Sequence, residues 1–115
     1  MGDDITNVPA NSWTHVAAIE LEAGKYKIEW YVRIDPVSSN EPVWGTRITS
    51  SYGDSGQLLQ RHVSNQANIT TAFCVMDIPE KTTIYLQVFH SIPNINLGIH
   101  DIQFCITPLN NIIIA

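Results

Sequence analysis

The segment YKIEWYVRI, residues 26–34, decides the fold of this 115-residue chain. Large apolar side chains occupy every second position, and most of the positions between them are polar. A period of two is that of a β-strand, whose successive side chains point to opposite faces. One face is predicted to meet the core and the other to face outward. The first face carries Tyr26, Ile28, Trp30, Val32 and Ile34, and the second carries Lys27, Glu29, Tyr31 and Arg33.

The same alternation recurs on both sides of this segment, and no window keeps the apolar stripe of a helix. Residues 35–40 and 50–56 are rich in turn formers and are predicted loops. We expect residues 13–21 to form a hairpin with the decisive strand, because Gly24 permits a tight turn. Further strands are predicted at residues 43–49, 57–63, 69–76, 82–90 and 98–107.

About eight short strands without helices favour an all-β fold, a two-sheet antiparallel jelly-roll sandwich, with an immunoglobulin-type sandwich as the alternative. We place the domain at residues 13–109, after a lead-in at residues 1–12 and before an apolar tail at residues 110–115.

Side-chain alternation also assigns faces within other strands. Trp13, Ala17, Ile19 and Leu21 share one side of the first strand, and Ile69, Thr71, Phe73 and Val75 share one face of a later strand. In residues 82–90, Ile84, Leu86 and Val88 fill one face, while Tyr85, Gln87 and Phe89 fill the other. Because both faces of that strand carry bulky groups, we expect one to meet the core and the other to meet a neighbour.

Charge excludes two classes of partner. Six Lys and Arg against eleven Asp and Glu give a net charge of −5, so the chain repels phosphate backbones and anionic lipid. Its longest apolar run, residues 112–115, is far shorter than the roughly 20 residues of a membrane span. The start of the chain lacks the basic and apolar regions of a signal peptide. We therefore expect neither nucleic-acid binding nor membrane insertion.

Three segments resemble the jelly rolls of the complement globular-head and tumour-necrosis-factor-like superfamily. Residues 21–28 (LEAGKYKI) are similar to the opening of those domains, residues 78–88 (IPEKTTIYLQV) to their penultimate segment, and residues 100–109 (HDIQFCITPL) to their closing strand. The resemblance implies a homotrimer that binds ligands through loops or grooves between subunits. Related modules tip bacteriophage fibres, so it also implies a virion-surface or extracellular location.

The sequence contains no motif in which residues suited to catalysis or metal binding have the required spacing. The four histidines lie on different predicted strands, and neither Cys74 nor Cys105 has the close partner of a zinc site. The Gly53-Asp54-Ser55-Gly56 stretch lacks the spacing of a nucleophile elbow. We expect no enzyme activity, no metal and no cofactor. Free thiols are favoured over a disulfide, which would need the two Cα atoms within about 7 Å.

The leading hypothesis is a non-enzymatic homotrimeric binding module of a virion fibre that contacts a host-surface protein or glycan. The alternative is a carbohydrate-binding module of a secreted protein, in which Trp13, Trp44 or Tyr52 stacks on sugar rings. A core position is the competing interpretation of Trp44. Predicted ligand-binding residues are Glu41, Trp44, Tyr52, Asp54, Asn94 and Asn96, and predicted trimer-interface residues are Tyr31, Tyr85, Gln87 and Phe89.

Overall fold

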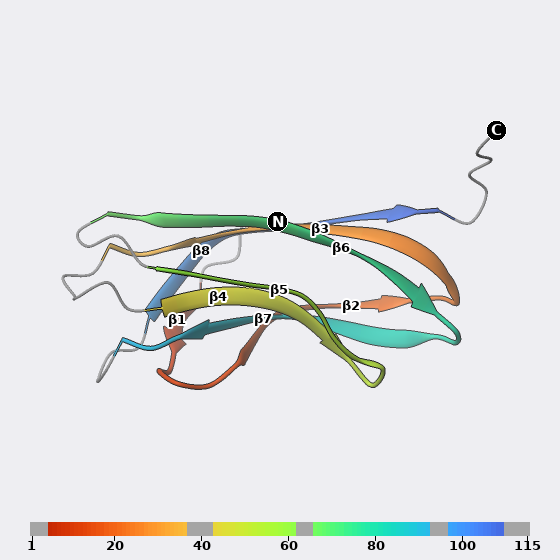
Figure 1. Cartoon of the computed structure of the whole chain (residues 1–115), viewed down its shortest axis with the longest axis horizontal. Coiled ribbons are helices and arrows are strands. Elements are labelled where there is room, and N and C mark those ends of the chain that lie inside the picture. The colour runs from red at the N-terminus through yellow and green to blue at the C-terminus, as the bar shows by residue number, and fades with distance from the viewer. Residues whose placement is uncertain (1–4, 37–42, 62–65, 93–96, 110–115) are drawn as a thin grey trace.

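Eight antiparallel strands stack in two layers in the computed structural model (Figure 1), which describes residues 5–36, 43–61, 66–92 and 97–109. One sheet has the order β1-β8-β3-β6 and the other β2-β7-β4-β5. This is the predicted all-β two-sheet sandwich, with jelly-roll strand order. The strands are β1 (Ile5–Val8), β2 (Thr14–Leu21), β3 (Gly24–Ile34), β4 (Val43–Ser50), β5 (Gly53–Arg61), β6 (Asn68–Ile78), β7 (Thr82–His90) and β8 (Leu97–Pro108).

Strand β3 is central to the first sheet and follows the predicted alternation. It pairs with β6 from Gly24↔Ile78 to Ile34↔Asn68 and with β8 along its other edge. All five predicted inward side chains are buried, and the four outward ones are half-buried. The β3–β8 register shifts between Tyr31 and Arg33, where Asp101 adopts a φ of 54°, a left-handed conformation that aspartate tolerates.

The core lies between the two sheets and consists mainly of aliphatic side chains around two indoles. Trp30 and Trp44 are its largest members. Trp30 Nε1 donates a 2.7 Å hydrogen bond to Thr46 Oγ1, a buried contact that joins β3 of one sheet to β4 of the other. The remaining buried apolar residues include Val8, Val16, Ile28, Val32, Ile34, Ile48, Ile84, Leu86, Val88, Ile92, Ile99 and Ile102.

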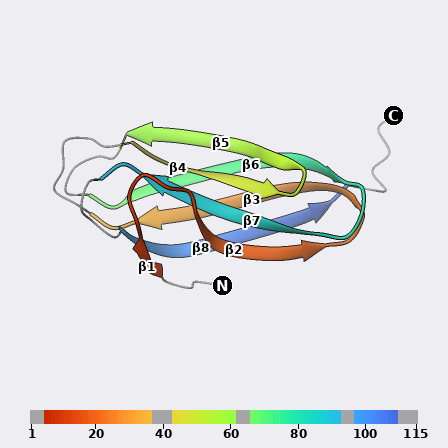
Figure 2. The ribbon, with the colours of Figure 1, turned by 90° about the horizontal axis from the view of Figure 1, so that it is seen from below.

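The predicted hairpin of residues 13–21 with β3 is wrong. β2 belongs to the opposite sheet, where it pairs with β7. The short connection at Glu22 and Ala23 therefore crosses between layers, because both strands carry buried apolar side chains that face each other across the core. In the described part of the chain, β4 and β5 are the consecutive strands that pair within one sheet (Figure 2).

The structure differs from the sequence predictions in three further places. The register of β2 shifts between His15 and Ala17, so Trp13 lies against Phe89 on the outer face, whereas Leu21 is buried. The predicted loop at residues 50–56 is a two-residue turn followed by β5, which begins at Gly53. Strand β1, inside the stretch described as a lead-in, pairs with β8 and was not predicted. Val63, the predicted end of a strand, lies outside the described residues.

Replacing Thr46 by Val tests the buried link between the sheets. The substitution keeps the shape of the side chain but leaves the Trp30 N–H without an acceptor, which costs about 1–3 kcal/mol of unfolding free energy. Urea unfolding measures the loss. Thr107→Val, on an exposed position of β8, should change stability by less than about 0.5 kcal/mol. An equal effect of the two substitutions would contradict this account of the core.

Candidate functional site

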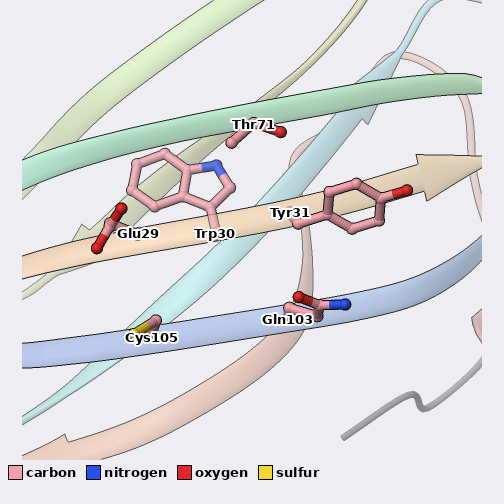
Figure 3. Close-up of a pocket in the computed structure, with 6 residues that line it drawn as sticks. All are labelled: Glu29, Trp30, Tyr31, Thr71, Gln103 and Cys105. Carbon is pink, nitrogen blue, oxygen red and sulfur yellow. The ribbon is translucent and has the colours of Figure 1, made fainter.

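A depression of about 270 Å³ lies on the outer face of the β1-β8-β3-β6 sheet. It is lined by residues of three adjacent strands (Figure 3). Tyr31 and Glu29 come from β3, Thr71 from β6, and Gln103 and Cys105 from β8. Trp30 also lines it, although its ring is buried on the core side of β3. The site is thus the reverse side of the strand that organises the core.

Strand pairing sets the geometry of the depression. Tyr31 pairs with Thr71 on one side and with Gln103 on the other, so the three side chains share one row across the sheet. Glu29 occupies the next row on β3, between Phe73 and Cys105. Successive rows on one face lie about 7 Å apart along a strand. A half-buried phenol ring is therefore surrounded by a hydroxyl, an amide and a carboxylate.

These polar groups keep their hydrogen-bonding capacity. Within the part of the chain that the structure describes, the side chains of Tyr31, Thr71 and Gln103 make no hydrogen bond, and Glu29 has only a 4.0 Å contact with Lys27 Nζ. Polar groups with unused donors and acceptors around an aromatic ring are typical of ligand sites, where a few placed groups fix the ligand's orientation. The depression can therefore bind a ligand that has both hydroxyls and an apolar face.

The outer face of the other sheet is also aromatic and polar, but its groups bind one another. Gln87 Nε2 lies 3.2 Å from His15 Nδ1, and Arg47 Nε donates to Gln87 Oε1 at 2.8 Å. Arg47 also pairs with Asp54 at 3.1 Å. The arginine carbon Cζ lies 4.1 Å from the centre of the Trp13 ring. One hydrogen-bonded chain thus crosses all four strands of this sheet, which leaves fewer groups for a ligand.

The three predicted ligand-binding residues that the structure describes have different surroundings. Trp44 is 0% exposed, so its ring cannot stack on a ligand, and the core interpretation is correct. It is buried because it faces inward from β4 between the two sheets. Tyr52 is exposed at the β4–β5 turn, and Asp54 belongs to the Arg47 network. Glu41, Asn94 and Asn96 lie outside the described residues.

The four predicted interface residues divide between the two outer faces. Tyr31 lies in the depression, whereas Tyr85, Gln87 and Phe89 lie on the opposite side of the sandwich. Tyr85 stacks on His15 with ring centres 4.2 Å apart, and Phe89 contacts Trp13 at 5.5 Å. These contacts are within one chain, and the role of the four residues in a trimer stays a prediction.

Sequence reasoning missed Glu29, Thr71, Gln103 and Cys105 as site residues. The alternation of side chains had already predicted that Glu29 and Tyr31 point outward. The alternation does not give the strand order, which puts β6 and β8 on either side of β3.

In the described ranges, no group of three His, Cys, Asp or Glu could hold a metal ion, and no helix has the length and apolar composition to cross a bilayer.

Comparison with solved structures finds a similar fold. The structure is similar to the C-terminal domain of EclA, a sugar-binding protein, with a TM-score of 0.54 and 12% identity over 93% of this chain and 77% of that one. No protein-family model matches the chain, and no curated protein is significantly similar to it in sequence. At this identity the likeness shows the fold alone. It does not confirm the resemblance to complement or tumour-necrosis-factor-like domains.

The two cysteines differ in accessibility, which a thiol reagent can measure. Both are free; Cys105 is exposed in the lining of the depression and Cys74 is buried. Burial raises the pKa of the Cys74 thiol, and a hydrogen bond with Ser55 lowers it only in part. A chromogenic disulfide reagent should therefore modify one thiol quickly in the native protein. The second should react slowly, at a rate that rises with pH as thiolate forms.

Replacing Cys105 by Ser should remove the fast reaction and leave the slow one. Two equally fast thiols, or a fast reaction that survives Cys105→Ser, would show that Cys74 is not protected by the core.

Proposed function

We propose that the protein is a carbohydrate-binding module and that the depression around Tyr31 binds the sugar. The observation that carries this proposal is the row of Thr71, Tyr31 and Gln103, in which a ring lies between polar side chains with unused hydrogen-bonding capacity. The fold likeness to a sugar-binding domain supports the same class of function. Our proposal thus takes the alternative hypothesis from the sequence and assigns it to different residues.

A sugar suits this site because it presents C–H groups on one face and hydroxyls around its edge. The apolar face can lie on the Tyr31 ring, as aromatic side chains offer an apolar body with a polar tip. The hydroxyls can donate to the Glu29 carboxylate and exchange hydrogen bonds with Thr71 and Gln103. A purely apolar ligand would instead leave these polar groups desolvated without partners, at a cost of about 1–3 kcal/mol each.

Replacing Tyr31 by Ala tests the proposed role of the ring. Removing a central aromatic contact should weaken binding by at least about tenfold, the equivalent of 1.4 kcal/mol. The measurement is a glycan array to find bound sugars, followed by titration calorimetry of wild type and variant. Tyr85→Ala, on the opposite sheet, is the matched control and should bind as wild type does.

Thr71→Val provides a second variant with little change of shape, in case Tyr31→Ala affects folding. It should weaken binding through loss of one hydroxyl contact. Full binding by both Tyr31→Ala and Thr71→Val, or loss of binding in Tyr85→Ala alone, would exclude the depression as the site.

Self-association through the same face is a second candidate function, favoured by exposed apolar side chains on the edge strand β6. Phe73 is 62% exposed, Ile69 50% and Val75 49%. Exposed apolar side chains that share one face of a strand occur at protein–protein interfaces. A homotrimer on a virion fibre that binds a host surface is the form of this candidate implied by the sequence resemblance. In such a trimer, another subunit would cover the depression around Tyr31.

Light scattering across a dilution series separates the two candidates. With the depression open to sugar, the protein should have the mass of one chain at all concentrations. A mass of three chains that falls to one in Phe73→Lys would favour self-association through β6 and overturn the assignment of this face to carbohydrate.

A further inference from the structure

A second depression, of about 520 Å³, is lined by residues of the turns that precede β3, follow β6 and join β4 to β5. These three turns lie toward the same end of the sandwich (Figure 1, right). It is lined by Gly24, Lys25, Tyr52, Asp77, Ile78 and Pro79. Tyr52 is 47% exposed, and its hydroxyl lies 3.4 Å from Glu80 Oε1. The second depression thus combines an exposed aromatic ring with the charged groups of Lys25, Asp77 and Glu80. The first depression likewise combines an aromatic ring with polar groups.

The register of β3 with β6 connects the two depressions. Lys25 pairs with Asp77 in the second depression, and Tyr31 pairs with Thr71 in the first. The outward rows between them are Lys27↔Val75 and Glu29↔Phe73. All four rows share one face because side chains alternate along each strand. The six-residue step from Lys25 to Tyr31 is about 20 Å long.

The four rows form a continuous track of outward side chains along β3 and β6. An exposed aromatic residue, Phe73, lies in the middle of this track. Phe73 points away from the core at 62% exposure, and Lys27 Nζ lies 5.3 Å from its ring centre. Covering the ring would remove apolar surface from water at about 25 cal/mol per Å². An apolar protein surface laid along the track would also remove the Lys27–Glu29 ion pair from water, which is unfavourable because the long 4.0 Å contact does not replace the lost hydration. A chain of sugars covers the ring and offers these charged groups hydroxyls.

From these observations we infer that the site takes an extended, neutral oligosaccharide, which runs along β3 and β6 from Tyr31 past Phe73 to Tyr52. This inference rests on the proposed carbohydrate function. Neutrality is favoured over negative charge because the two lysines of the track, Lys25 and Lys27, face three carboxylates, those of Glu29, Asp77 and Glu80. The net charge of −5 on the whole chain also disfavours polyanions.

Binding as a function of chain length tests the inference. The probes are neutral oligosaccharides of glucose, mannose, galactose and N-acetylglucosamine, each with one to six units, titrated into the wild-type protein. In the series that binds, affinity should rise at least tenfold from one unit to six. Phe73→Ala and Tyr52→Ala should lower six-unit affinity toward the one-unit value and leave one-unit binding unchanged.

Ile69→Ala is the matched control, because Ile69 is a similarly exposed residue of β6 that lies beyond Tyr31, outside the track. It should bind every probe as wild type does. Equal affinity for one and six units would overturn the extended site while the proposed function stands. Preference for a six-unit galacturonate over every neutral series would overturn neutrality. If no probe binds, both the proposed function and the extension fail.

Discussion

The hydrogen bond between Trp30 and Thr46 links the two sheets at the strand that carries the site. It is 2.7 Å long and buried, so water cannot replace it. The Trp30 ring occupies the core beneath β3, and its neighbours Glu29 and Tyr31 necessarily project from the other face. The position of the depression therefore depends on the packing of the indole. A shift of β3 by one residue would exchange the two faces and destroy core and site together.

The two outer faces of the sandwich carry similar residues, but the side chains of the two faces make different contacts. Across β2, β7, β4 and β5, His15, Gln87, Arg47 and Asp54 satisfy one another, which orders the surface but leaves few groups to bind a ligand. Around Tyr31, Thr71 and Gln103 have no such partners among the described residues, and Glu29 has only a 4.0 Å contact with Lys27. Unused hydrogen-bonding capacity, more than aromatic content, distinguishes the proposed carbohydrate face.

The sequence predicted what depends on a single strand and missed what depends on strand order. The inward and outward faces of β3 and β7 were correct because their alternation is unbroken. The hairpin of residues 13–21 with β3 was wrong because a short connection does not reveal whether it crosses between sheets. The bulge in β2 reversed the side of Trp13. Thr71 and Gln103 join Tyr31 through pairings between residues distant in sequence, which no local pattern encodes.

Amide chemical-shift mapping tests the central claim most directly, because it locates a bound sugar without altering any residue. Isotope-labelled protein would be titrated with the sugar that gives the strongest signal on a glycan array. We predict the largest shifts at residues 29–31, 71–73 and 103–105, the three strand segments around the depression. Shifts centred instead on His15, Arg47 and Gln87 would place the sugar on the opposite sheet and contradict the account.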